Sequence, residues 1–206
     1  ADGNGLWASQ MYHVLESFYD APLTVLRIDD SGTEGLSGGE DNQDNQGDDR
    51  GNFSSLCRDV LVTREDDRLR GGSHGLGKAV LWRSSSISTV LFSSKFENKF
   101  RLIGTTDLPG HKTEADHWAG RGWYGQPEET DRGKRAVSIW DNEAMTVAEG
   151  AYLARPNLTQ GTTILIVGFR EPHAEEERDL IEIASDVRKS ASKWFWPSLE
   201  PGNETL

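Results

Sequence analysis

The chain has 206 residues, a net charge of −12 and 35% hydrophobic residues, the composition of a polar globular domain with its own core. No apolar run approaches the ~18 residues that a spanning helix needs, so we expect no membrane partner. The single cysteine, Cys57, excludes an internal disulfide and a multi-cysteine zinc site, and a reducing, cytoplasmic setting is expected.

The negative charge is concentrated between residues 29 and 68, which hold twelve Asp or Glu against four Arg. Within this region, residues 37–51 are of low complexity and contain no large apolar side chain. Such a segment cannot bury enough surface to offset the entropy of ordering, so we predict a mobile acidic insertion there. Because an acidic surface repels phosphates, we do not expect nucleic acid to bind through this segment.

Apolar periodicity and turn residues predict four helices and four strands. In chain order these are a helix with an apolar stripe from Trp7 to Phe18, a strand at 23–28, a short helix at 53–63, a helix beginning at Lys78, a hairpin of strands 87–92 and 99–104, a strand at 162–169 and a helix at 174–197. Residues 108–136 lack a clear period, and we expect an irregular insertion. Helices mixed with an antiparallel hairpin predict an α+β fold.

A glycine-rich turn runs from Gly72 to Gly77 and is followed by Lys78 and Ala79. Closely spaced glycines let backbone N–H groups approach a polyphosphate, and a helix beginning there adds a favourable dipole. The turn fits the P-loop pattern G-x-x-x-x-G-K through Lys78. However, Ala79 stands where that pattern needs a hydroxyl for Mg²⁺, and residues 64–70 are not a buried apolar strand. A P-loop-like nucleotide-hydrolysing site that uses Lys78 is therefore an alternative.

Three glycine motifs follow one another in the sequence. They are Ile28-Asp29-Asp30-Ser31-Gly32 continuing through Thr33-Glu34 to Gly35, then Gly72-Ser73-His74-Gly75-Leu76-Gly77, then Gly161-Thr162-Thr163 at the start of a strand. Their order resembles the GHKL (Bergerat-fold) ATPases, which include gyrase, the ninety-kilodalton heat-shock chaperones, DNA mismatch-repair ATPases and microrchidia proteins. The resemblance covers residues 23–169 and implies a two-layer α/β sandwich, with a mostly antiparallel mixed sheet covered by helices on one face.

The resemblance implies that ATP, with Mg²⁺, is the ligand. The nucleotide-binding residues that it implies are Asp30, Gly32, Gly35, Gly72, His74, Gly75, Gly77, Lys78 and Thr162. The Asp30 carboxylate would accept a hydrogen bond from the adenine amino group, because a carboxylate is an acceptor and that group is a donor. Thr162 would support the base through an ordered water, and the second motif would cradle the phosphates. Two residues separate Gly32 from Gly35, where the family usually has one.

The resemblance also implies an ATP lid at residues 31–77 that includes the acidic insertion, nucleotide-driven closure and homodimerisation, and an attached effector module. GHKL ATPases carry their general base and a Mg²⁺-binding Asn in a helix with the pattern E-x-x-x-N-x-x-D-A. Residues 13–21 place His13 and Ser17 at those positions and do not match. No catalytic residue or metal ligand is therefore assigned, and we expect that helix to precede residue 1.

On this interpretation, residues 1–206 are a single ATP-binding domain of a longer protein, which hydrolyses ATP if the preceding helix is present. The missing general base favours a different class of protein, a non-catalytic interaction module with a degenerate nucleotide pocket. We keep it as the second alternative.

Overall fold

The computed structural model describes residues 3–20, 22–40, 51–58, 77–112, 117–118, 120–131, 133–172 and 178–194. The chain divides into two compact units, residues 1–170 and residues 171–206. The first unit holds the sheet and the second holds one helix. No helix in the described ranges is long and apolar enough to cross a membrane.

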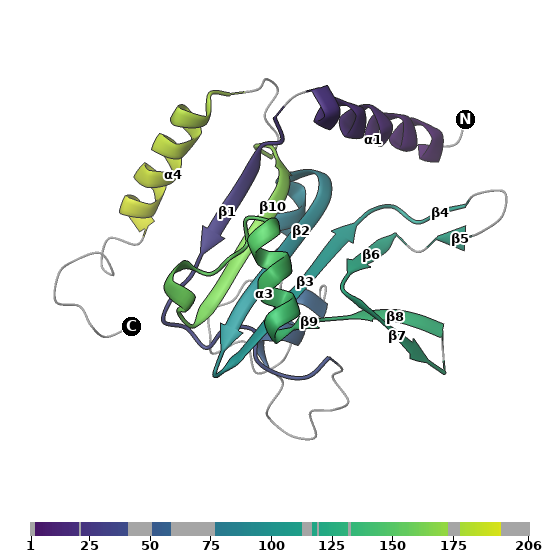
Figure 1. Ribbon diagram of the computed structural model, residues 1–206. Coiled ribbons are helices and arrows are strands. Elements are labelled where there is room, and N and C mark those ends of the chain that lie inside the picture. The colour runs from purple at the N-terminus through teal and green to yellow at the C-terminus, as the bar shows by residue number, and fades with distance from the viewer. Residues whose placement is uncertain are drawn as a thin grey trace. The chain divides into compact units, whose positions relative to one another are not determined.

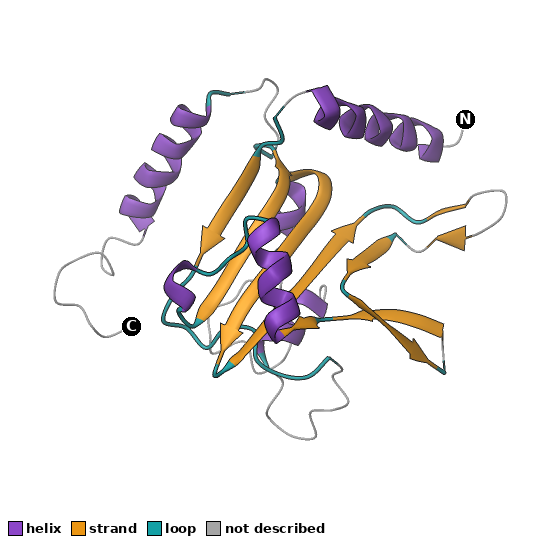
Figure 2. Ribbon diagram, viewed as in Figure 1, coloured by secondary structure: helices purple, strands orange, loops and turns teal. Residues whose placement is uncertain are grey.

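A six-stranded antiparallel sheet forms the centre of the first unit (Figure 1, Figure 2). Its hydrogen-bonded order is β1-β10-β2-β3-β6, and β9 also pairs with β3. The strands are β1 (Val25–Asp29), β2 (Ser85–Phe96), β3 (Lys99–Asp107), β6 (Arg121–Tyr124), β9 (Ile139–Trp140) and β10 (Gly161–Phe169). Two smaller pairs are β4 (His111–Lys112) with β5 (His117–Trp118), and β7 (Gln126–Thr130) with β8 (Gly133–Val137).

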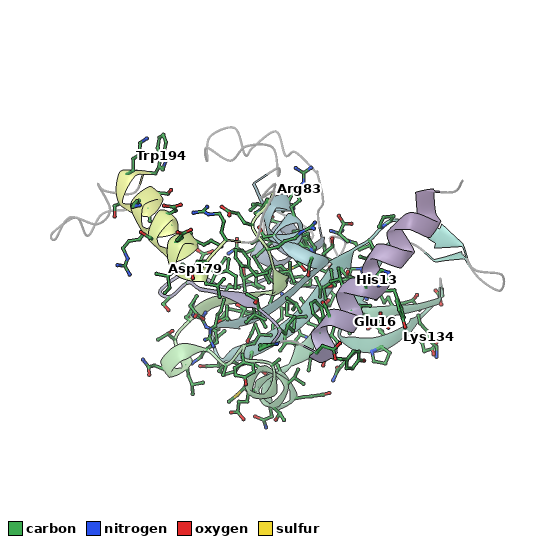
Figure 3. All side chains as sticks on the ribbon, turned by 90° about the horizontal axis from the view of Figure 1, so that it is seen from above. His13, Glu16, Arg83, Lys134, Asp179 and Trp194 are labelled. Carbon is green, nitrogen blue, oxygen red and sulfur yellow. The ribbon has the colours of Figure 1, made fainter. Side chains whose placement is uncertain are left out.

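Among the described helices, the two longest lie at the two ends of the described chain. They are α1 (Gly3–Asp20), α2 (Ala79–Arg83), α3 (Asp141–Gly150) and α4 (Leu180–Trp194), with a π-helical turn at Ser54–Arg58 and a 3-10 turn at Pro156–Leu158. The second unit contains α4. Asp179 directly precedes this helix and Trp194 is its last residue (Figure 3). The predicted α+β fold with a mostly antiparallel sheet is confirmed.

Helix α3 covers one face of the sheet (Figure 1). Ala144 and Ala148 pack there with Leu102, Leu153 and Leu165. Small alanines let the helix approach the strands closely, and each of these residues is buried. The sequence analysis did not predict α3, because its inward face is made of alanines that give only a weak apolar period.

The opposite face of the sheet is covered as well, by α2 and the π-helical turn. Trp82 of α2, Phe53 and Cys57 pack against Phe92 and Ile103, which are neighbours across the β2–β3 ladder. Since alternate residues of a strand point to opposite faces, Leu91 and Leu102 belong to the α3 side. The sandwich prediction required helices on one face of the sheet, and α3 supplies that layer. The second face is covered too, by α2 and the π-helical turn.

The first predicted strand, the hairpin and the late strand are confirmed as β1, β2–β3 and β10. The hairpin turns at Glu97, whose φ of 51° gives the tight reversal. The expectation of irregular structure at 108–136 was wrong in part, because β4, β5, β6, β7 and most of β8 lie in that range. The predicted short helix at 53–63 is helical through Arg58, and residues 59–63 lie outside the described residues.

The acidic segment begins and ends at one place on the sheet. Phe53 N donates a hydrogen bond to Ser37 O at 3.0 Å. An ideal Cβ at Gly51 would lie 2.1 Å from Ser37 O and 2.5 Å from Gly38 N, so only glycine allows the two arms to come this close. The predicted mobile insertion at 37–51 therefore has ordered ends, while its residues 41–50 lie outside the described residues.

Candidate functional site

The chain turns tightly directly after β1, where the first glycine motif lies. Asp30 N donates to Thr162 O at 2.9 Å, and Gly32 N donates to Gln160 O at 3.0 Å. Gly32 and Gly35 have φ values of +79° and +68°, in the left-handed region that favours glycine. The first and third sequence motifs, more than a hundred residues apart in the chain, are thus hydrogen-bonded neighbours.

Asp30 presents an exposed carboxylate at this turn. Its Oδ1 accepts a hydrogen bond from Thr33 Oγ1 at 2.6 Å, and no hydrogen bond reaches its Oδ2 from the part of the chain that is described. The Thr33 contact orients the carboxylate. One oxygen remains able to accept a hydrogen bond from a ligand.

Asp29, the preceding residue, has a different environment. Its carboxylate accepts hydrogen bonds from Arg27 at 2.8 and 3.0 Å and from Thr163 Oγ1 at 2.6 Å. The hydrogen bond from Arg27 is the main reason why the pKa of the Asp29 carboxyl lies below its ordinary value. Alternation along the strand places Asp29 on the α3 face, and its hydrogen bonds with Arg27 and Thr163 make its carboxylate part of the scaffold.

Arg155 is buried and holds the same region together from the α3 side. It donates to Asp30 O at 2.6 Å, to Thr163 Oγ1 at 3.1 Å, to Thr159 O at 3.2 Å and to Gln160 O at 3.3 Å. Burial lowers the pKa of its guanidinium. Since each of its three nitrogens already has a partner in the protein, Arg155 fixes the backbone around Asp30 rather than binding a phosphate.

Ser94 is fully buried on β2, on the face opposite to Arg155, and joins the turn to β10. Its Oγ accepts a hydrogen bond from Leu36 N at 2.8 Å and donates one to Gly161 O at 2.9 Å. The same oxygen lies 3.4 Å from Thr162 Oγ1. An ideal Cβ at Gly35 would lie 2.7 Å from it, so Gly35 is required by close packing as well as by its backbone conformation.

The second glycine motif enters the described structure only at its end. Lys78 Nζ donates to Ser55 O at 2.6 Å, and α2 begins at the next residue. Both α2 and the π-helical turn pack on the sheet face that carries Thr162, so Lys78 belongs to that side. The sequence-predicted residues Gly72, His74 and Gly75 lie outside the described residues.

A buried arginine, Arg101 of β3, holds the strap of residues 36–40 that follows the turn. It donates to Leu36 O at 2.7 Å, to Gly38 O at 2.8 Å and to Glu40 Oε1 at 3.4 Å. Burial lowers the pKa of the Arg101 guanidinium to about 10, and the charge of Glu40 opposes that shift. The strap is therefore fixed to the sheet by a cation that is itself inaccessible to water.

Aromatic rings and a second arginine complete the strap's anchor. The Arg101 guanidinium lies 4.0 Å from the Phe53 ring centroid and 4.2 Å from that of Trp140. Arg58 donates to Glu40 Oε2 at 2.9 Å and lies 4.2 Å from the Trp123 ring centroid. Glu40 thus bridges two guanidinium groups, and its charge offsets theirs in a largely buried position.

Helix α1 contains the positions that the family pattern would assign to catalysis. His13 Nδ1 lies 3.7 Å from the Glu16 carboxylate, both on α1 (Figure 3), and Ser17 Oγ donates to Val14 O at 2.7 Å. These contacts stay within the helix. Within the described ranges, no group of three or more His, Cys, Asp or Glu could hold a metal ion.

A small cavity lies on the α3 face and shares Arg155 with the Asp30 turn. Its lining includes Ser93 and Phe100 from the sheet, Ala148 from α3, and Arg155. Because Ser93 and Ser94 are consecutive in β2, they point to opposite faces. The cavity therefore opens away from the side that carries Thr162.

The sequence analysis did not identify three residues that organise the site, Ser94, Arg101 and Arg155. The sequence did contain an indication for Ser94, which follows Val90 and Phe92 at every second position along β2 and therefore points to the same buried face. A polar side chain that points into the core needs a hydrogen-bond partner. Arg101 and Arg155 gave no such indication, because a sequence does not show that an arginine is buried.

The chain was compared with protein-family models, with curated proteins and with solved structures, and nothing matches in any of the three comparisons.

Proposed function

We propose that this chain binds ATP at the turn after β1, with the base end of the nucleotide at Asp30 and Thr162. The observation that carries the proposal is the direct hydrogen bond from Asp30 N to Thr162 O at 2.9 Å. It joins the ends of two neighbouring strands that carry the first and third motifs. These are the two motifs to which the resemblance assigns the adenine.

The chemistry of the turn supports a base rather than a phosphate at this end. Asp30 offers an exposed carboxylate oxygen that can accept a hydrogen bond from an amino group, and a carboxylate repels phosphates. At the left-handed Gly32 nothing lies within 4 Å of an ideal Cβ, which leaves room for a flat ligand to approach the backbone. The phosphates would extend toward the second motif, whose last residues, Gly77 and Lys78, open α2 on the same side of the sheet.

Within this proposal the acidic insertion belongs to the lid, the strap at 36–40 is the fixed base of that lid, and binding drives lid closure and the association of two copies. Hydrolysis, with Mg²⁺, would use the general base of the helix that the resemblance implies, whose pattern residues 13–21 do not match. The attached module that such a switch would control is likewise a proposal from the resemblance. The residues at the base end act by accepting hydrogen bonds and by excluding water, and they transfer no proton.

The experiment is a calorimetric titration of a non-hydrolysable ATP analogue and of ADP into the 206-residue chain, with and without Mg²⁺. We expect saturable binding that Asp30→Asn weakens by about tenfold or more, as expected for a lost hydrogen bond to a charged group. The matched control is Asp29→Asn, which changes the neighbouring carboxylate that Arg27 and Thr163 hold. It should lower stability and leave the affinity of the folded protein within about twofold.

Two results would reject the proposal. If the folded wild-type chain binds neither nucleotide, the chain is better explained as an interaction module with a degenerate pocket. If Lys78→Ala abolishes binding while Asp30→Asn has no effect, the phosphates are held as in a P-loop and the base end has been misplaced.

A further inference from the structure

The proton arrangement around Ser94 has a consequence for which purine base the pocket accepts. A serine hydroxyl has one hydrogen, and a carbonyl oxygen can only accept. Because Ser94 Oγ is 2.9 Å from Gly161 O, the hydrogen of Ser94 is committed to that carbonyl. The Leu36 N–H at 2.8 Å occupies one lone pair of the same oxygen.

One lone pair of Ser94 Oγ is left, and Thr162 Oγ1 lies 3.4 Å away. Since Ser94 has no second hydrogen to give, Thr162 is the donor in this contact. Its hydrogen then points toward Ser94, and the oxygen of Thr162 turns its lone pairs to the other side. Asp30, whose N–H donates a hydrogen bond to Thr162 O, also presents an acceptor.

We propose that Ser94 is a specificity-determining residue, which makes the base end of the pocket an acceptor-only surface by fixing the direction of the Thr162 hydroxyl. This inference rests on the proposed nucleotide site and names its substrate class, a purine with an amino group at position 6. An amino group donates directly to such a surface. A 6-oxo group is an acceptor and meets only acceptors.

Ser94 is placed to do this by the fold and not by local sequence. It lies on β2, whose neighbour β10 carries Gly161 and Thr162 in register with Lys95 and Ser94, respectively. Its side chain is fully buried, so water does not compete for its hydrogen. Figure 1 shows β1, β10 and β2 side by side, which brings the turn, the threonine and the serine to one end of the sheet.

The test compares ATP with inosine triphosphate, which has an oxo group in place of the 6-amino group. Dissociation constants are measured by calorimetry for the wild-type chain, Ser94→Ala and the control Ser93→Ala. We expect the wild type to prefer ATP, and Ser94→Ala to reduce the ratio of the two constants by about fivefold, because the freed Thr162 hydroxyl can rotate and donate. Ser93→Ala removes a hydroxyl from the same strand on the opposite face and should leave the ratio unchanged.

Thr162→Val supplies a second test that keeps the side-chain shape. It should reduce the ratio as Ser94→Ala does, and Ser94→Ala should have no further effect in the Thr162→Val background, since both act through one hydroxyl. If Ser94→Ala does not fold, as judged by circular dichroism, the proposal is tested by comparing the wild type with Thr162→Val, each by its ratio of dissociation constants for ATP and inosine triphosphate.

The outcomes separate this inference from the function on which it rests. ATP binding with an unchanged ratio in Ser94→Ala or Thr162→Val overturns the role of Ser94 and leaves the nucleotide site standing. Equal affinity of the wild type for ATP and inosine triphosphate also overturns the role of Ser94 and leaves the nucleotide site standing. Absence of all nucleotide binding by the folded wild type overturns both.

Discussion

The Cα of Gly161 lies against Asp30, which is 131 residues earlier in the chain. An ideal Cβ at Gly161 would be 2.5 Å from the carbonyl oxygen of Asp30, 2.6 Å from its Oδ1 and 2.7 Å from the clamping Arg155 Nη2. The φ of Gly161 is +134°, a conformation that side-chain-bearing residues rarely adopt. The glycine of the third motif therefore makes room for the aspartate of the first.

Gly161→Ala should disrupt both the fold and the candidate site. The added methyl group must displace backbone and carboxylate atoms and also strains the backbone, so we expect unfolding to become easier by on the order of 2 kcal/mol. Chemical denaturation measures this. Gly150→Ala is the control, because nothing lies within 4 Å of that position, and it should change stability by less than about 0.5 kcal/mol or improve it. Equal effects of the two variants would contradict the close contact.

Glu40→Gln should loosen the strap at 36–40. The change removes the negative charge that two guanidinium groups share, one of them fully buried, and we expect a loss of about 2 kcal/mol in the free energy of unfolding. Glu128→Gln, in the half-exposed pair with Arg135, should cost less than about 0.5 kcal/mol. Limited proteolysis should also cut Glu40→Gln faster than the wild type within residues 36–58, and an unchanged pattern would argue against the strap's dependence on Glu40.

Acid should reveal the Asp29 network. The hydrogen bond from Arg27 holds the pKa of the Asp29 carboxyl below its ordinary value of 3.8, so the ionised form is favoured in the folded state. This contribution to stability is fully present above that ordinary value and is lost as the pH falls through the lower folded-state pKa. Urea denaturation should therefore show stability falling below about pH 4. Asp29→Asn should flatten that part of the profile, and an identical slope in the variant would exclude Asp29 as its source.

Cys57 should be unreactive in the folded chain. It is fully buried, and burial raises the pKa of its thiol to about 12 from 9.0. Iodoacetamide at pH 8.5 should modify the denatured protein rapidly and the native protein only as fast as it unfolds. The same shift lowers stability as the pH rises from about 9 toward the folded-state value, because only the unfolded thiol ionises there. Rapid native modification would show that the π-helical turn opens in solution.

Local patterns in the sequence were sufficient for much of the fold. Residues close together in the sequence were enough to predict four features. These are β10 from its β-branched run at 162–169, the hairpin around Glu97, and α1 and α4 from their apolar stripes. Helix α3 and the small strands at 111–137 were not foreseen. Their apolar residues are alanines or few in number, so tertiary packing rather than periodicity stabilises them.

For the candidate site, the sequence by itself determined which residue types are present and where glycine is placed. Asp30, Gly32, Gly35 and Thr162 were selected by the resemblance, whose motifs consist of glycine spacing and the end of a strand, and these are local properties. Only the tertiary structure decided that Asp29 is part of the scaffold, because its hydrogen bonds with Arg27 and Thr163 depend on the side of the sheet to which β1 presents it. It also decided the roles of Ser94, Arg101 and Arg155, since burial and hydrogen-bond partners exist only once distant strands have paired.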